Sequence, residues 1–213
     1  MARLILVRHG ETEWNKSFRY QGHSDIHLND NGIEQAARVR DRLAGERIDV
    51  IYSSDLSRAC ETARSIASMH GMAEIRQTAL LREMDFGQAE GMTFDEIKEN
   101  YPRIAGDLQA WRTRSPEIRL PNGESIAQLG ARVAQFAEEL KGYEPEETVL
   151  VVAHGGSLQV LICLLLGIGL EHWWQVRLGS ASVTIMETSP YGAAFIVLND
   201  TCHLQRSAVS ENR

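Results

Sequence analysis

Residues 4 to 15 read Leu-Ile-Leu-Val-Arg-His-Gly-Glu-Thr-Glu-Trp-Asn. Four apolar residues end at an arginine, a histidine and a glycine, and the chain then turns polar. Such a short apolar run predicts a buried strand that delivers polar side chains to the edge of a sheet. In open α/β sheets, ligands bind in the crevice outside the carboxyl ends of the strands. The cation of Arg8, the imidazole of His9 and the small Gly10 suit an anion, with phosphate as the leading candidate.

Apolar runs with the period of strands alternate with amphipathic runs along the chain. We expect strands at 4–7, 49–52, 73–76, 148–153, 182–187 and 194–199, and helices at 33–43, 56–69, 94–100, 105–111, 126–140 and 157–166. Residues 29–32 supply an Asn or Asp cap for the first helix, and residues 53–55 a turn and cap for the second. The alternation predicts an α/β fold, a three-layer α/β/α sandwich with a mixed, mainly parallel central sheet. We expect one domain over residues 1–213, with a small cap region at roughly 88–122.

The composition limits the partners that the protein can have. The chain has 213 residues and a formal net charge of -7. Nucleic-acid binders need a basic face, so nucleic acid is not an expected partner. Residues 149–170 are about as long as a membrane span, but His154, Gly155 and Gly156 divide them into strand, turn and helix. We therefore expect buried core in this segment and no membrane partner.

The cysteines and the first residues predict a cytoplasmic protein. Three cysteines are odd in number and lack metal-ligand spacing, which is typical of reduced thiols in the cytosol. The apolar run near the amino terminus is too short for a signal peptide. The apolar late strands and the pair Trp173-Trp174 favour a homodimer.

Four side chains share one feature, since each lies at the end of a predicted strand or at the start of the next element. These are Arg8, His9, Arg58 and His154. Strand ends that are far apart in sequence converge in a doubly wound sheet, so these groups should form an electropositive pocket. Both guanidinium groups offer forked donors that match phosphate oxygens, and Asn15 adds a neutral donor.

This set of residues predicts phosphoryl transfer. A neutral imidazole can act as nucleophile and hold the phosphoryl group as phosphohistidine, while a second imidazole, if protonated, stabilises charge. The leaving alkoxide needs a proton from a carboxylic acid, for which Glu83 is our first choice and Asp85 our second. A metal site formed by His9, His154 and Glu83 is disfavoured, because two arginines in the pocket repel a cation. We expect no metal and no cofactor.

The pattern extends over four blocks in order. They are Leu6-Val7-Arg8-His9-Gly10-Glu11-Thr12 with Asn15; Ser53-Ser54 with Leu56, Arg58-Ala59 and Thr62-Ala63; Glu83 with Phe86-Gly87 and Glu90-Gly91; and Ala153-His154-Gly155-Gly156. Together the blocks resemble the signature of the histidine phosphatase (phosphoglycerate mutase-like) superfamily. The resemblance implies that His9 is the phosphorylated nucleophile and Glu83 the general acid and base. It also implies that the phosphate pocket is formed by Arg8, Asn15, Arg58 and His154.

Three functions fit these blocks. The first is a metal-independent phosphomonoesterase, the second a 2,3-bisphosphoglycerate-dependent phosphoglycerate mutase, and the third a non-catalytic protein that binds a phosphorylated ligand. By resemblance, a mutase carries a long basic insertion between the third and fourth blocks, whereas Glu83 and His154 lie only 71 positions apart. A non-catalytic member is expected to lack a pocket residue, and none is missing. The phosphatase is therefore favoured.

The substrate is expected to be a small phosphorylated metabolite. The motifs Tyr20-Gln21-Gly22-His23 and Pro121-Asn122-Gly123-Glu124-Ser125, with the segment 198–204, are similar to small bacterial members of the family. Those members include α-ribazole phosphatases and metal-independent phosphoserine phosphatases, which implies α-ribazole 5′-phosphate or phosphoserine as substrate. The candidate substrate-binding residues are Gln21, Gly22, Gly155 and His203. For the last of these, a role in packing is an equal alternative.

Overall fold

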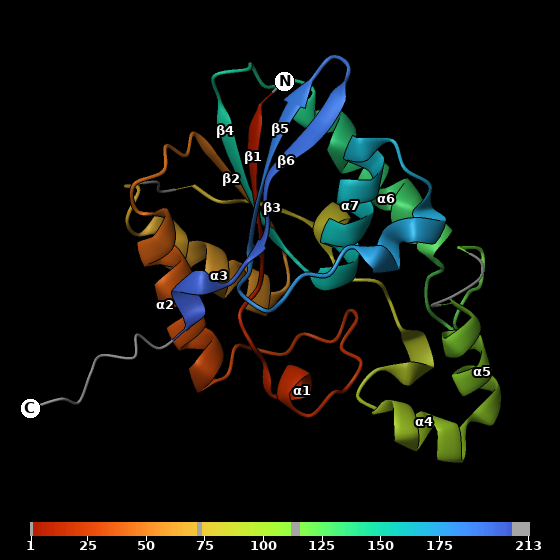
Figure 1. Ribbon diagram of the computed structural model, residues 1–213. Coiled ribbons are helices and arrows are strands. Elements are labelled where there is room, and N and C mark those ends of the chain that lie inside the picture. Colours follow the sequence, from red (N-terminus) through yellow and green to blue (C-terminus); the bar gives the residue numbers. More distant parts are fainter. Residues whose placement is uncertain (1, 72–73, 112–115, 206–213) are drawn as a thin grey trace, which may run out of the picture.

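A six-stranded sheet forms the centre of the molecule (Figure 1). The computed structural model describes residues 2–71, 74–111 and 116–205. In the order β3-β2-β4-β1-β5-β6, the strands are β3 (Arg76–Thr78), β2 (Val50–Ser54), β4 (Thr148–Ala153), β1 (Arg3–Arg8), β5 (Val183–Ser189) and β6 (Gly192–Asp200). The first four are parallel to one another, whereas β5 is antiparallel to both β1 and β6. The expected mixed, mainly parallel sheet is thus confirmed.

Helices cover both faces of this sheet and extend beyond one end of it (Figure 1). The helices α2 (Asp30–Leu43) and α3 (Ser57–Ala67) pack on one face, and α6 (Ile126–Leu140) and α7 (Gly155–Leu166) on the other. The short α1 (Glu13–Lys16) lies beyond the carboxyl end of β1, and α4 (Phe94–Asn100) packs against α5 (Pro102–Trp111). Short 3-10 turns occur at Ala79–Leu81, Gly87–Ala89, Leu170–Gln175 and Cys202–Leu204.

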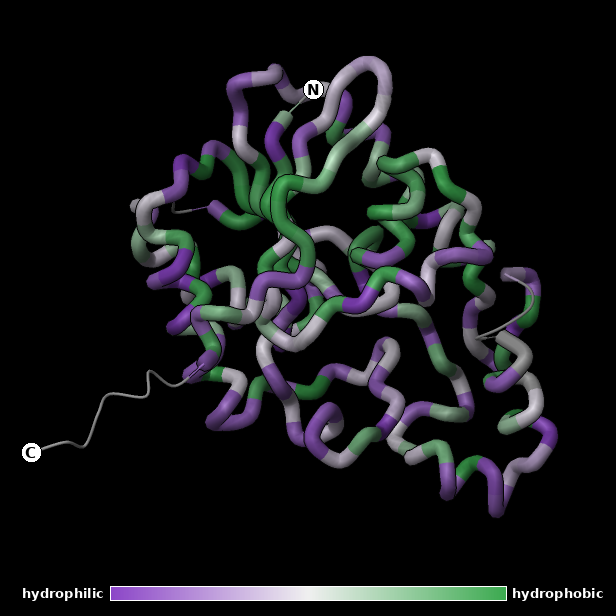
Figure 2. The backbone as a smooth tube through the Cα atoms, viewed as in Figure 1, coloured by the Kyte–Doolittle hydropathy of each residue, from purple (hydrophilic) through white to green (hydrophobic). Residues whose placement is uncertain are grey.

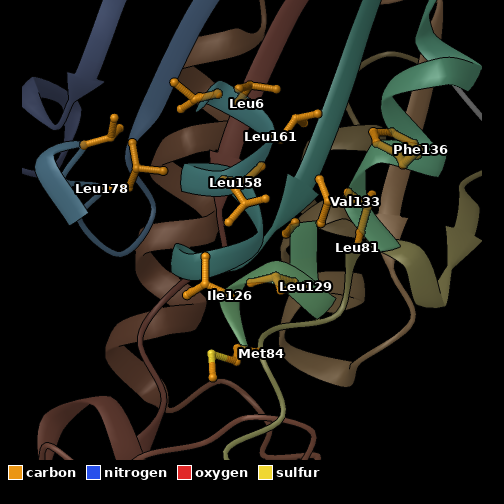
Figure 3. Packing of buried hydrophobic residues seen from close by; sticks show 14 of the residues in the cluster. Leu6, Leu81, Met84, Ile126, Leu129, Val133, Phe136, Leu158, Leu161 and Leu178 are labelled. Atoms are coloured by element: carbon orange, nitrogen blue, oxygen red, sulfur yellow. The ribbon is translucent and has the colours of Figure 1, made fainter. Parts of the chain in front are cut away.

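The alternation of side chains along β1 divides the core into two layers. Leu4 and Leu6 belong to the cluster under α6 and α7, whereas Ile5 and Val7 belong to the cluster under α2 and α3. A central parallel strand is covered on both faces, which explains why the run is apolar throughout. In Figure 2 the strands in the centre of the molecule are mostly apolar, whereas the outer segments are more polar. In Figure 3, Leu6 lies next to Leu161 of α7, and Val133 and Phe136 of α6 belong to the same cluster.

The predicted elements agree best with the structure where the apolar period is strongest. The ranges 94–100, 126–140 and 148–153 match their elements at both ends. The expected cap of α2 is present, because the side chain of Asn29 accepts a hydrogen bond from the Gly32 amide at 2.8 Å. The helix nevertheless begins at residue 30, three positions earlier than predicted.

Two predicted features were wrong in detail. Ser53 and Ser54 do not form a turn and cap, because they are paired within β2, and Leu56 precedes α3 without a capping side chain. The strand expected at 73–76 is found at Arg76–Thr78, and residue 73 lies outside the described residues.

The segment 149–170 is divided into β4 and α7 as expected. Among the residues described, no helix is both long and apolar enough to cross a membrane.

Candidate active site

Two predicted histidines meet where β1 and β4 end side by side. Arg8 is in register with Ala153, and the backbone amide of His9 donates a hydrogen bond to the Ala153 carbonyl at 2.9 Å. The next residue on β4 is His154, whose ring centroid lies 5.0 Å from that of His9 at an interplanar angle of 61°. Neighbouring parallel strands therefore bring the first and fourth sequence blocks together.

His9 is held as a neutral imidazole with one nitrogen free. Its Nδ1 lies 2.6 Å from the carbonyl oxygen of Gly10. A carbonyl can only accept, so Nδ1 carries the proton and Nε2 keeps its lone pair. Burial, followed by the charges of Arg58 and Arg8, lowers the pKa of His9 well below its usual value. The ring is therefore suited to act as a nucleophile at neutral pH.

His154 is also neutral, and both of its ring nitrogens have partners. The Nε of Arg58 donates to His154 Nδ1 at 3.2 Å, which leaves the ring proton on Nε2, 2.8 Å from Ser54 Oγ. Burial and the charge of Arg58 lower the pKa of His154 well below its usual value. The positive charge beside His9 thus comes from arginines, and the protonated second imidazole considered from the sequence is disfavoured.

Arg58 is a fully buried cation, with 0% of its surface exposed. Its Nη1 donates to the Ser24 carbonyl and its Nη2 to the Gly22 carbonyl, both at 2.8 Å. Burial lowers the pKa of Arg58 to about 10, so the group remains charged at neutral pH. Within the described part of the chain three of its five N–H groups are occupied, which leaves two for a ligand.

Glu90 organises the loop that holds Arg58, a role that the sequence analysis did not assign. Its carboxylate accepts hydrogen bonds from the amides of His23 and Ser24, both at 2.8 Å. Gly22 in this loop has a φ of +52°, and a Cβ there would overlap the Glu90 carboxylate. Only glycine therefore fits at position 22. The presence of the pair Glu90-Gly91 in the third block was the one feature of the sequence that pointed to Glu90.

Arg8 and Glu83 both lie next to the glycine pair that begins α7. The position of a Cβ on Gly155 would be 3.7 Å from both Arg8 Nε and Glu83 Oε2. The Gly156 amide donates to Glu83 Oε2 at 3.0 Å, and a Cβ on Gly156 would overlap this carboxylate. A carboxylate is favoured at the amino end of a helix. The glycine pair thus makes room for Glu83 beside the arginine.

One N–H group of Arg8 has no hydrogen-bond acceptor in the described part of the chain. Its Nη1 donates to the Leu178 carbonyl at 2.7 Å, whereas its buried Nε has no hydrogen-bond partner among the described residues. Burial lowers the pKa of Arg8, and the charge of Glu83 partly opposes this. Because an unpaired buried donor is costly, this N–H is well placed to bind an anion.

Two further predicted residues lie next to Thr12. The Asn15 Oδ1 accepts a hydrogen bond from the Thr12 amide at 3.1 Å, and Gln21 Oε1 accepts one from the Thr12 hydroxyl at 2.9 Å. These contacts occupy the amide oxygen of each side chain. Asn15 also lines a cleft together with Arg8.

Asp85 and His203 have other contacts. The carboxylate of Asp85 accepts a hydrogen bond from the Gly87 amide at 2.7 Å and belongs to a turn, so Glu83 is the better placed of the two carboxyl groups. The His203 Nε2 donates to the Ala181 carbonyl at 3.0 Å, and the charges around its ring are those of Asp200, Arg42 and Arg38. These contacts favour the packing alternative for His203.

Arg132 of α6 fixes the segment that carries Glu83, although no motif in the sequence points to this residue. Its guanidinium donates to four backbone carbonyls and forms a two-bond pair with Glu124 at 2.8 and 3.1 Å. The carbonyls are those of Ala79 at 3.2 Å, Leu80 at 2.9 Å, Arg82 at 2.9 Å and Glu83 at 3.1 Å. One side chain therefore holds residues 79–83 in place.

Replacing Arg132 with methionine is expected to lower kcat by about 100-fold, because small displacements of a reacting group have effects of that size. KM should change much less, since the arginines of the pocket are untouched. Steady-state kinetics on a folded variant measure both constants. Arg47→Met, which removes an exposed arginine paired with Asp49, serves as control and should match the parent. An unchanged kcat in folded Arg132→Met would contradict the assignment.

The two neutral histidines should make stability depend on pH. In the unfolded chain each imidazole binds a proton below about pH 6.5, whereas in the folded protein the pKa values of His9 and His154 are lower. The unfolded state then binds more protons, so the free energy of unfolding falls as pH falls below about 6.5. The slope approaches about 1.4 kcal/mol per pH unit for each histidine.

Urea denaturation between pH 7.5 and pH 5.5 measures this slope. In His154→Gln the mean slope over this range should be smaller by about 0.7 kcal/mol per pH unit, because one group that titrates near the middle of the range in the unfolded chain is gone. Equal slopes in the two proteins would show that His154 is not held neutral. His172→Gln, which changes an exposed histidine, should retain the parent slope.

Comparison with known proteins identifies the family. The model of the histidine phosphatase superfamily (branch 1) matches residues 4–201. The chain belongs to this superfamily. The family expected from the four blocks is therefore confirmed, and with it the prediction of a phosphatase-class enzyme. The site described above brings together residues from all four blocks, with His9 next to His154, Arg58 bound to His154, and Glu83 bound to Gly156.

Individual members of the superfamily resemble this chain over most of its length. Phosphoserine phosphatase 1 of Hydrogenobacter thermophilus is 36% identical over 204 residues, which cover 96% of this chain and 95% of that protein. Phosphoglycerate mutase-like protein 4 of Arabidopsis thaliana is 37% identical over 162 residues, 75% of this chain and 69% of its own. The crystal structure of the alpha-ribazole phosphatase from Shigella flexneri has a TM-score of 0.84 and 31% identity, covering 93% of this chain and 96% of that one.

Proposed function

We propose that this histidine phosphatase hydrolyses small phosphate monoesters without a metal, through a phosphohistidine on His9. The observation that carries the proposal is the neutral His9 ring, whose Nδ1 is held by the Gly10 carbonyl and whose pKa is lowered by the nearby charges of Arg58 and Arg8. The two arginines would bind the phosphate dianion, with the Asn15 amide nitrogen as a further donor and the His154 ring, whose nitrogens are held by Arg58 and Ser54, as a wall of the pocket. Their positive charge takes the place of a metal ion.

In the first step, Nε2 of His9 attacks phosphorus and the bond from phosphorus to the ester oxygen breaks. The protonated Glu83 carboxyl gives its proton to the leaving oxygen, so that a neutral alcohol departs. The position of Glu83 next to Arg8, which would bind the phosphate, supports this role. The products of the step are the alcohol, the Glu83 carboxylate and phosphohistidine.

In the second step, water attacks the phosphorus of phosphohistidine. The Glu83 carboxylate takes a proton from this water, the bond from phosphorus to Nε2 breaks, and inorganic phosphate leaves. His9 returns to its neutral form with the proton still on Nδ1, where the Gly10 carbonyl holds it. The Arg132 contacts to residues 79–83 would keep Glu83 in position through both steps.

The substrates to be tested first are phosphoserine and α-ribazole 5′-phosphate. They follow from the names of two similar proteins, a phosphoserine phosphatase and an alpha-ribazole phosphatase. Gln21, Gly22 and Gly155 lie around the pocket and are proposed to contact the substrate. Residues 88–122, which include α4 and α5, are proposed to form the cap.

Release of inorganic phosphate from a panel of monoesters tests the proposed activity. The panel contains phosphoserine, α-ribazole 5′-phosphate and 3-phosphoglycerate, each measured with and without excess chelator. We expect phosphate release that the chelator does not reduce. Conversion of 3-phosphoglycerate into its 2-phospho isomer without phosphate release would indicate a mutase instead. Binding of these esters without any turnover would indicate a non-catalytic phospho-ligand binding protein.

A further inference from the structure

A cleft of about 740 Å³ extends from Arg8 over the segment around α1. Besides Arg8 and Asn15, its lining includes four aromatic side chains from three short segments. They are Trp14, Phe18, Tyr20 and Phe94. Since Arg8 would bind the phosphate, the rest of the same substrate molecule is the group that reaches this space. We call it the leaving-group cleft.

The walls of the leaving-group cleft are held in place by specific contacts. Arg19 forms two hydrogen bonds with the Glu96 carboxylate of α4, at 2.7 and 3.1 Å, and donates to the Gly91 carbonyl at 2.6 Å. A Cβ on Gly91 would lie 3.2 Å from the indole ring of Trp14, so glycine permits this close approach. These contacts join the segment after α1 to α4 and fix the distance between the aromatic walls.

The two other cations along the leaving-group cleft differ in how firmly they are held. Arg19 is bound by Glu96 at 2.7 Å, whereas Lys16 is exposed and lies 3.8 Å from Glu13. Phosphoserine would bring a carboxylate into the cleft, and carboxylates are bound best by a free guanidinium group. Among the lining residues described, the arginine left is Arg8, which the phosphate would occupy. Because an exposed lysine binds a carboxylate less well than a free guanidinium group, the aromatic lining makes the cleft better suited to an uncharged group than to an amino acid.

We propose that the leaving-group cleft selects phosphate monoesters whose alcohol carries an aromatic or heteroaromatic ring. This inference rests on the proposed function. Aromatic rings pack face to edge or in offset stacks, and each such pair contributes beyond its buried area. Phe18 is 85% exposed and Phe94 is 37% exposed, so both retain surface that a ring can cover. A cleft of this volume is also in the range of pockets that hold ring-containing ligands.

The test compares 3-phenylpropyl phosphate with propyl phosphate, because the two leaving groups differ in the ring and have similar basicity. We expect kcat/KM to be at least tenfold higher for 3-phenylpropyl phosphate, and higher than for phosphoserine. Phe94→Ala and Phe18→Ala should each reduce the ratio of the two constants several-fold. The exposed Phe18 side chain has little packing to lose, so its variant should remain folded. Tyr191→Ala removes a fully exposed aromatic ring outside the cleft and should leave the ratio unchanged.

The outcomes separate this inference from the function on which it rests. Equal kcat/KM values for the propyl and phenylpropyl esters, or a preference for phosphoserine, would overturn the aromatic selectivity and leave the phosphatase intact. If the ratio of kcat/KM for 3-phenylpropyl phosphate to that for propyl phosphate is the same in the parent, Phe18→Ala and Phe94→Ala, the ring of the substrate does not bind in this cleft, and the inference is also overturned. Failure to hydrolyse any of the esters, in a folded protein, would instead refute the phosphatase.

Discussion

Replacing His9 with alanine is expected to abolish turnover, lowering kcat by at least about 10⁴-fold, as is found when a nucleophile is removed from other enzymes. The reason is that the free Nε2 is the atom proposed to bond to phosphorus. The same variant should lose covalent labelling by a ³²P-labelled ester. A phosphohistidine label is lost in acid and retained in base, which distinguishes it from a phosphoserine label.

A matched histidine variant makes the labelling result specific. His172→Ala removes a half-exposed ring on the 3-10 turn Leu170–Gln175, away from the pocket, and should label and turn over like the parent. Circular dichroism and thermal unfolding establish that both variants are folded. Label retained in His9→Ala would move the nucleophile to another residue, and acid-stable label in the parent would rule out phosphohistidine.

Much of the fold could be predicted because its core strands have no polar face. The run before Arg8 and the one before His154 are buried on both sides, and such runs are recognisable without any partner. The predicted elements were wrong where the secondary structure of a segment depends on pairing with strands distant in sequence. Ser53 and Ser54 have the composition of a turn, yet both are strand residues because β3 and β4 pair with β2 on either side. Local propensity is weaker than a full set of ladder hydrogen bonds.

The site residues were predictable in identity but not in arrangement. Strand ends and glycine pairs indicated His9, Arg58 and His154, because the order of parallel strands places those ends together. The tautomer of each ring depends on a single neighbour, and no pattern in the sequence encodes it. The same holds for Arg132, which reaches the segment of Glu83 from a helix that follows it by about forty residues.

Replacing Arg58 with methionine is expected to have the second largest effect, a fall in kcat/KM of roughly 10³-fold, the upper range for loss of one group that stabilises the transition state. Two N–H groups of Arg58 are free for phosphate, and its charge is one of the two beside His9. Removing it also takes away a cause of the lowered pKa of His9, so that pKa should rise toward its usual value. Titration of the His9 ring by NMR measures this shift directly.

The change in pKa separates an electrostatic role for Arg58 from a purely structural one. Its loss leaves the Gly22 and Ser24 carbonyls without a donor, and each buried unpaired group costs about 1–3 kcal/mol, so Arg58→Met is also expected to be less stable. Arg58→Lys keeps the charge without the fork, and should hold the pKa of His9 low while kcat/KM still falls. Arg64→Met, an exposed arginine on the same helix, should change neither quantity. If the His9 ring titrates in Arg58→Met as it does in the parent, the guanidinium does not act on His9 through its charge, and the proposed pairing of nucleophile and cation is refuted.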